Sequence, residues 1–229
     1  MSFSNQLRNL YRKPAHPERE SSFARINRRQ MEAHLKVSRY GTFELTDAIR
    51  PAFDLRVVPE EACSRQEWKD RKTGVSVPVL VGSASREKLF DLFFDLLTPL
   101  GETVDVVLES SHGRIQGECA TFFRSDIDMP VFKSILCDFE APLLNDGCLG
   151  IAAVNQADPA EVRFDEHKIL LVYGDTEKFE RIFKRHGIPR KPDARFLIEE
   201  EHVHTTKPPY HRMLGDLRIA LGMECNLLY

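Results

Sequence analysis

The sequence predicts an α+β domain, an α/β sandwich of the ferredoxin-like type, in which three β-α-β units form a mixed, largely antiparallel sheet with the helices mainly on one face. From about residue 77 onwards, segments with apolar residues at a period of two alternate with segments whose apolar residues are three and four apart. The first pattern is typical of strands and the second of helices. The residue pattern of 79–112 recurs ninety positions later. The link at 110–117 is too short for a helical crossover, so the first two units should meet as an antiparallel hairpin.

Length and composition fit one soluble globular domain. The chain has 229 residues, 42% hydrophobic and 29% charged, which excludes a largely disordered protein. No apolar run approaches the roughly 20 residues of a membrane-spanning helix, and the N-terminus lacks the apolar stretch of a secretory signal. The five cysteines are scattered and form no C-x-x-C pair, which suits a reducing compartment. We therefore expect a cytoplasmic protein without membrane attachment.

The first forty residues form a basic arm. Residues 1–40 carry nine Lys and Arg residues against three acidic ones, so the arm has a charge of +6 and the rest of this chain of net charge −3 has −9. Residues 22–36 have only a loose apolar side, which predicts an extended or helical segment. The arm could dock on its own acidic body, or it could contact a partner subunit or a polyanion. Residues 41–229 then form a single α/β domain.

The first β-α-β unit spans about residues 77–112. Its first strand is 77–82, and its second, 103–109, alternates apolar and polar residues. Between them, a helix over 85–97 has apolar residues spaced three and four apart, and a proline and a glycine follow it. The apolar positions are Leu89, Leu92, Phe93, Leu96, Leu97 and Leu100.

The second unit, at about 117–155, is a weaker copy. It begins with a strand at 120–124. Asp128 is a plausible helix N-cap, and the apolar stripe after it predicts a helix that ends at Asn145-Asp-Gly. The strand 148–154 completes the unit.

The third unit, at about 166–202, repeats the first most closely. The matching residues are Val79 with Ile169, Ser85 with Asp175, Glu109 with Glu199, and His112 with His202. After this unit, a C-terminal helix over about 209–222 has one apolar side and should dock on the body.

The strongest local candidate for chemistry is the segment Glu199–His204 at the end of the third unit. Residues two apart in a strand share a face, so His202 and His204 could ligate one divalent metal ion, with Glu200 beside them. The repeat adds His112 at the equivalent turn of the first unit.

The competing interpretation of this segment is a polar strand end that runs into a loop. The prolines at 208 and 209 support it, because the chain must leave the sheet there. Ile198 should face the core, so a continuing strand would bury Glu200 and His202 on the same side, where both need polar partners. Either the strand stops, or these groups form a polar cluster at the end of the sheet.

Three classes of function remain open from the sequence. The first is a non-catalytic cytoplasmic binding or regulatory protein, compatible with a homodimer, because no nucleophile motif or clustered catalytic set is present. The second is a metal-dependent enzyme that uses the H-x-H site. The third is nucleic-acid binding through the basic arm, against which the acidic body argues. A divalent metal is the one cofactor that the sequence indicates.

Overall fold

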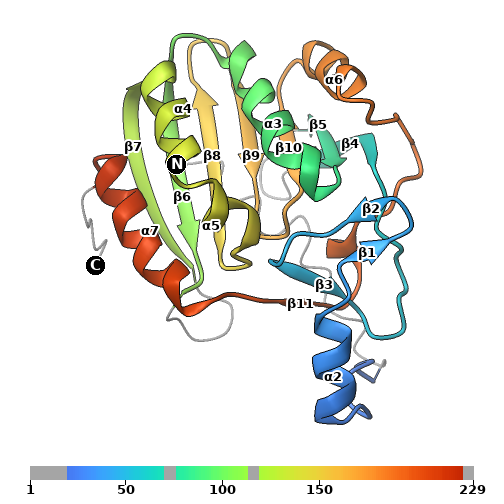
Figure 1. Cartoon of the computed structure of the whole chain (residues 1–229). Helices are drawn as coiled ribbons and strands as arrows, with labels where there is room; N and C mark the ends of the chain where they lie inside the picture. Colours follow the sequence, from blue (N-terminus) through green and yellow to red (C-terminus); the bar gives the residue numbers. More distant parts are fainter. Residues whose placement is uncertain (1–19, 70–75, 113–118, 224–229) are drawn as a thin grey trace.

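The computed structural model describes residues 20–69, 76–112 and 119–223. A seven-stranded sheet forms the centre of the molecule (Figure 1). The strand order is β4-β5-β10-β9-β8-β6-β7, and every neighbouring pair is antiparallel. The strands are β4 (Ala62–Lys69), β5 (Ser76–Ser83), β6 (Thr103–Ser110), β7 (Ala120–Asp128), β8 (Leu149–Asn155), β9 (Ala160–Phe164) and β10 (Leu170–Tyr173).

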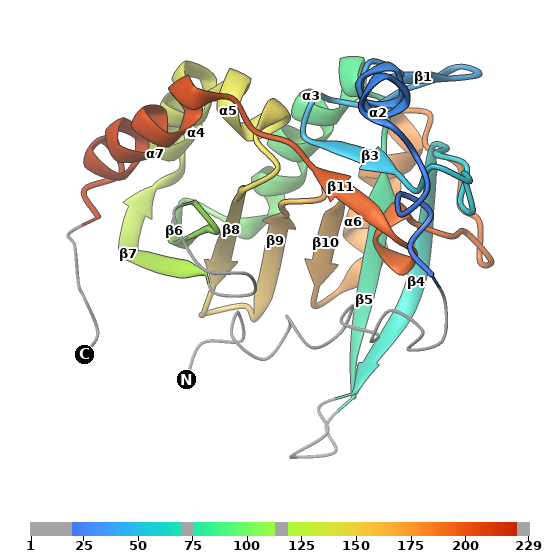
Figure 2. The same ribbon diagram turned by 90° about the horizontal axis from the view of Figure 1, so that it is seen from below.

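Helices cover one face of this sheet, as Figures 1 and 2 show. They are α3 (Arg86–Leu97) with the 3-10 turn η1 (Thr98–Leu100), α4 (Met129–Asp138), α5 (Glu140–Asn145), α6 (Thr176–Arg185) and α7 (Pro208–Ala220). The apolar stripe of α3 points into the core, where Leu92, Phe93 and Leu96 are fully buried. The ring of Phe93 packs against Phe164 of β9, with 5.1 Å between the ring centroids. Burial of one such side chain contributes about 1.5–3 kcal/mol.

The opposite face is covered at the end of the sheet that carries β4, β5 and β10. After α6 the chain runs along the edge strand β4, where Cys63 N donates to Pro189 O (2.9 Å) and Lys191 N donates to Cys63 O (2.8 Å). Residues 194–198 then pack on the sheet, with Phe196 and Ile198 against apolar residues of β5 and β10. Both faces of this end are therefore buried.

A small layer, made of residues 20–58 and 197–207, completes this end of the molecule (Figure 2). Its elements are α2 (Arg28–Leu35), β1 (Arg39–Tyr40), β2 (Phe43–Glu44), β3 (Ile49–Pro51), the 3-10 turn η2 (Leu197–Glu199) and β11 (His202–His204). The strand β11 pairs antiparallel with β3 and lies outside the main sheet. Phe43, Ile49 and Leu197 share a separate apolar cluster within the layer.

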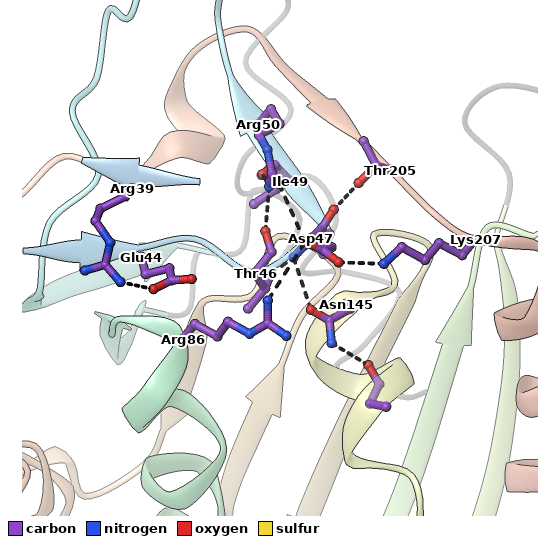
Figure 3. A network of polar contacts seen from close by, with 12 residues as sticks. Arg39, Glu44, Thr46, Asp47, Ile49, Arg50, Arg86, Asn145, Thr205 and Lys207 are labelled. Carbon is purple, nitrogen blue, oxygen red and sulfur yellow. Dashed lines mark hydrogen bonds and ion pairs between the residues drawn. The ribbon is translucent and has the colours of Figure 1, made fainter. Parts of the chain in front are cut away.

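A polar network around Asp47 holds the small layer to the rest of the domain (Figure 3). The Asp47 carboxylate accepts a hydrogen bond from Lys207 Nζ (2.7 Å) and lies 3.7 Å from Arg50 Nη2 and 3.9 Å from Arg86 Nη1. Its backbone N–H donates to the side-chain oxygen of Asn145, at the end of α5 (3.2 Å). Through its carboxylate and its backbone N–H, Asp47 thus connects β3, α3, α5 and the start of α7.

Helices packed on a mostly antiparallel sheet confirm the mixed α+β class that the sequence predicts. The hairpin between the first two units is also present, because β6 pairs with β7 from Ser110 opposite Ala120. The final helix is α7. Within the described part of the chain, no helix has the length and apolar character that a membrane crossing requires.

The structure does not confirm the ferredoxin-like arrangement of three repeated units. The strands β5 and β6, on either side of α3, have three other strands between them. In the third unit, residues 197–199 form the turn η2 instead of a second strand. The physical reason is that both edges of β10 are already paired, with β5 and β9, so Phe196 and Ile198 cover a face of the sheet instead of extending it. The polar stretch after residue 60 forms the edge strand β4.

Candidate metal centre

The two histidines of the H-x-H segment lie side by side on β11. The strand pairs with β3, with His202 opposite Pro51 and His204 opposite Ile49. Because residues two apart share a face of a strand, the two imidazoles point the same way, and their Nε2 atoms are 3.1 Å apart.

A third histidine, His167, completes the cluster from the turn between β9 and β10. Its ring centroid lies 5.0 Å from that of His202 and 4.7 Å from that of His204. One ring nitrogen of each of the three residues lies within 4.8 Å of the other two. The sequence did not single out His167, because it is thirty-five positions from His202 and no spacing rule connects them.

Asp165 builds the turn that presents His167. One of its carboxylate oxygens, Oδ1, accepts hydrogen bonds from the backbone N–H groups of His167 (3.0 Å) and Ile169 (3.1 Å). The turn also needs Lys168 in the left-handed backbone region, at φ 60°. A short side chain that bonds its own backbone two residues on is typical of such turns.

Each of the three imidazoles is oriented by a bond from its Nδ1 atom. His202 Nδ1 lies 2.7 Å from Glu200 O, and His204 Nδ1 lies 2.6 Å from Gly147 O. His167 Nδ1 lies 2.7 Å from Asp165 Oδ2. This leaves Nε2 of every ring available to a common ligand. Carbonyl and carboxylate acceptors behind metal-bound histidines are a regular feature of protein metal sites.

The protonation of the His202 and His204 rings follows from these partners. A backbone carbonyl only accepts, so Nδ1 of both His202 and His204 must carry the proton. In the neutral rings, Nε2 then carries a lone pair and no proton. The two Nε2 atoms are 3.1 Å apart, so their lone pairs face each other with no proton between them. A cation placed between the rings would remove this repulsion.

The pKa shifts agree with neutral rings on β11. Burial lowers the pKa of His202 and His204 to about 4, and the charge of His167 acts in the same direction. Burial also lowers the pKa of His167, but the charge and hydrogen bond of Asp165 outweigh it, so this pKa is raised. The charge of Asp165 thus favours the protonated form of His167, whereas burial favours the neutral forms of His202 and His204.

The other two predicted ligands, Glu200 and His112, do not join the three rings. The Glu200 carboxylate accepts from Arg195 Nη2 (2.8 Å), and only its backbone carbonyl contacts His202. His112 binds Asp146 instead, with 2.6 Å between Nε2 and Oδ2. This second cluster, which also contains Cys148, adjoins the first through Gly147.

Backbone contacts of residues 146–148 and 205 fix β11 against the start of β8. Gly147 N donates to Thr205 O (2.9 Å), and Thr205 N donates to Ala48 O (2.8 Å). A Cβ atom on Gly147 would lie 2.3 Å from Ala48 O, so only glycine allows this approach. The acceptor for His204 is thus placed by the contact that joins the small layer to the sheet.

The described part of the basic arm, residues 20–40, belongs to the small layer and is bound to the other parts of it. Ser22 N donates to Glu201 Oε2 (2.8 Å), and His34 Nε2 lies 2.9 Å from Pro51 O. Arg50 Nε in turn donates to Leu35 O (2.9 Å). Residues 1–19, which carry several of the arm's basic residues, lie outside the described residues.

Three imidazoles with ordered second partners suit a borderline metal ion such as Zn²⁺. Zinc–nitrogen bonds of about 2.0–2.1 Å in a tetrahedron place ligand nitrogens roughly 3.3 Å apart. The separation of 3.1 Å between His202 and His204 is close to this value. Catalytic zinc sites have three protein ligands and one open position, whereas structural sites usually have four protein ligands.

Comparisons of the chain with protein-family models, with curated proteins and with solved structures found no match.

Proposed function

We propose that the protein is a metal-dependent enzyme that binds one divalent transition-metal ion, Zn²⁺ in the first instance, through Nε2 of His167, His202 and His204. The observation that carries the proposal is the common orientation of the three rings. Each directs Nδ1 to an acceptor, and the Nε2 atoms of His202 and His204 approach within 3.1 Å without a proton to share.

The number of ligands favours a catalytic ion over a structural one. Among the described residues, the cluster supplies three ligand atoms, so a fourth position is left for water or a substrate. The three residues are only partly buried, so solvent can reach them. A metal ion in such a site lowers the pKa of its bound water to about 7 and polarises carbonyl or phosphoryl oxygens. We therefore expect hydrolytic or hydration chemistry.

The first experiment measures metal content and affinity. Protein purified without an affinity tag and without chelator is assayed for bound metal, and the apoprotein is titrated with Zn²⁺ against a chromophoric chelator. We expect one tight equivalent in the wild type and a loss of at least about 100-fold in affinity for His167→Ala, His202→Ala and His204→Ala, because each removes a ligand. His186→Ala is the matched control, since His186 pairs with Asp95 at another place. Absence of zinc binding, or equal affinity in all four variants, would falsify the site.

A second experiment tests the open coordination position. Co²⁺ replaces Zn²⁺, and its visible absorption reports coordination number and ligand exchange. We expect a four-coordinate spectrum that shifts when azide is added, because azide can replace a bound water. A spectrum that azide does not change would mean a closed site. That result would favour a non-catalytic binding or regulatory protein in which the ion is structural.

A further inference from the structure

We infer that Cys148 is a base-assisted nucleophilic thiol, with His112 as the base and Asp146 as the positioning residue, and that it is a site of covalent modification by carbon electrophiles. The inference does not depend on the proposed metal ion. It rests on a second cluster of side chains, which lies where the β6–β7 hairpin meets the start of β8.

The cluster brings a thiol, an imidazole and a buried carboxylate close together. A ring nitrogen of His112, a carboxylate oxygen of Asp146 and the Cys148 Sγ atom all lie within 4.8 Å of one another. The Asp146 side chain has 0% exposure, that of His112 has 8%, and Cys148 is partly exposed. Cys148 is therefore in part open to solvent, while the carboxylate is shielded from water.

Asp146 fixes the His112 ring. Its Oδ1 accepts from the backbone N–H of Cys148 (3.0 Å), and its Oδ2 lies 2.6 Å from His112 Nε2. Burial would raise the pKa of Asp146, but the bonds from His112, from the Thr206 side chain and from Cys148 N outweigh burial and lower it. An ionised carboxylate only accepts, so Nε2 of His112 carries the proton and the lone pair of the neutral ring is on Nδ1. No bond to Nδ1 is formed within the described part of the chain.

The thiol stays protonated at neutral pH unless a base removes its proton. Burial raises the pKa of Cys148, and the charges of Asp146 and Glu166 act in the same direction. A hydrogen bond with the Ser111 side chain and the charge of Lys168 oppose this rise. A further titratable group beside the cluster is His211 of α7, whose ring centroid lies 5.3 Å from that of His112.

The expected reaction is an alkylation with His112 as proton acceptor. The Sγ atom attacks the electrophilic carbon, a carbon–sulfur bond forms and the bond to the leaving group breaks. The thiol proton passes to His112, and the resulting imidazolium stays beside the Asp146 carboxylate.

Turnover of acyl substrates is not expected at this site, because it offers no oxyanion hole from its own loop. The N–H groups of Gly147, Cys148 and Leu149 already donate to Thr205 O, Asp146 Oδ1 and Asp146 O. The site should therefore accept an electrophile once and retain the adduct.

The test measures the alkylation rate of each cysteine with iodoacetamide, in full-length protein treated with EDTA at neutral pH, by peptide mass spectrometry. Cys137, which is exposed, serves as the reference thiol, and Cys63 reports on folding because it is buried and its pKa is raised to about 11. In the wild type, Cys148 should react faster than Cys137 although it is less exposed. His112→Gln should slow Cys148 by about 10-fold or more, because general-base assistance is lost. Asp146→Asn should slow it by a smaller factor, and His211→Gln should leave it unchanged.

Three outcomes would overturn the inference. One is a Cys148 rate in His112→Gln equal to that of the wild type. Another is a slower reaction of Cys148 than of Cys137 in the wild type. This comparison remains decisive even if the variants do not fold, which labelling of Cys63 would reveal. The third is protection of Cys148 by one equivalent of Zn²⁺ that persists in His202→Ala, because the thiol would then be a metal ligand. Failure of zinc to bind anywhere would affect the proposed metal site alone.

Discussion

At the scale of single residues, Asp165 has two separate tasks in the candidate metal centre. Its Oδ1 atom closes the β9–β10 turn, and its Oδ2 atom orients the His167 ring. The turn and the ligand therefore depend on different atoms of one side chain. A substitution that exchanges only one of these atoms can separate the two tasks.

Asp165→Asn should weaken zinc binding while it preserves the fold. The asparagine oxygen can still accept the two backbone N–H groups of the turn, but the –NH₂ group that replaces Oδ2 cannot accept from His167 Nδ1. We expect a loss of about 10–100-fold in zinc affinity, as is usual for such partners of metal-bound histidines. Chelator competition measures the affinity, and Glu166→Gln is the neighbouring control. An affinity equal to the wild type would show that Asp165 does not support the ligand.

The position of β11 requires a residue without a side chain at Gly147. We expect Gly147→Ala to destabilise the protein by about 1–3 kcal/mol, because its Cβ would lie 2.3 Å from Ala48 O, a backbone atom that cannot turn away. The same change should weaken zinc binding, since Gly147 O is the acceptor for His204. Urea unfolding and chelator competition measure the two effects.

Gly215→Ala is the control for this glycine substitution. Gly215 lies within α7, where an added Cβ would have no atom within 4 Å. Alanine is the better helix former by about 1 kcal/mol, so this variant should be as stable as the wild type or more stable. Equal loss of stability in both variants would contradict the close approach at Gly147.

At the scale of elements, the polar network of Figure 3 contributes to the position of the small layer. Around Asp47, the charges of Lys207, Arg50 and Arg86 converge on one carboxylate. The hydrogen bond from Lys207 is the main cause that lowers the pKa of Asp47, and the charges of all three cations add to it. The ionised form therefore stabilises the attachment of β3 and β11.

Acid should remove the contribution of Asp47 to stability. A carboxylate whose pKa is lowered by folding contributes fully above its unfolded pKa of about 3.9, and the contribution disappears as the pH falls through the folded value. Because Asp47 is about one-third exposed, we expect Asp47→Asn to cost only about 1 kcal/mol or less at pH 7, and less than that at about pH 3, which lies below the unfolded pKa. Urea unfolding at both pH values tests this.

Asp158→Asn is the control for the acid effect, because Asp158 is 74% exposed and forms an ion pair with Lys178. It should show no difference from the wild type at either pH. A cost for Asp47→Asn that persists unchanged at pH 3 would mean that the amide perturbs packing and that charge is not the cause.

At the scale of the whole molecule, the candidate ligands come from two parts of the structure. His167 belongs to a hairpin of the main sheet, and His202 and His204 belong to the small layer. A bound ion would therefore connect the β9–β10 turn of the sheet directly to β11 of the small layer. Metal binding and stability should be linked for this reason.

Zinc should raise the melting temperature of the wild type, and EDTA should reverse the rise. At a free zinc concentration one hundred times the Kd, binding to the folded state alone adds about 2.7 kcal/mol. His167→Ala should abolish the shift, because the remaining two histidines belong to one strand and cannot connect the two parts. Differential scanning calorimetry with and without metal measures this. A shift of the same size in His167→Ala would place the ion elsewhere.

The local pattern of the sequence determined the elements and the pairing of two ligands. Apolar residues three and four apart specify α3, because that spacing places them on one side of a helix. The period of two in a strand places His202 and His204 on one face, whichever strand their segment pairs with. These features depend on neighbours in the chain, so the chain alone is enough to predict them.

Only the tertiary structure decided the strand order, the role of the third unit and the third ligand. The order of the strands in a sheet depends on all of the strands together. The polar segment β4 forms an edge strand, and its own sequence does not indicate this position. His167 reaches β11 because the small layer folds back on the β9–β10 turn, through contacts between residues far apart in the chain. No local periodicity encodes such contacts, and for this reason the candidate metal centre could be recognised only when distant segments were placed together.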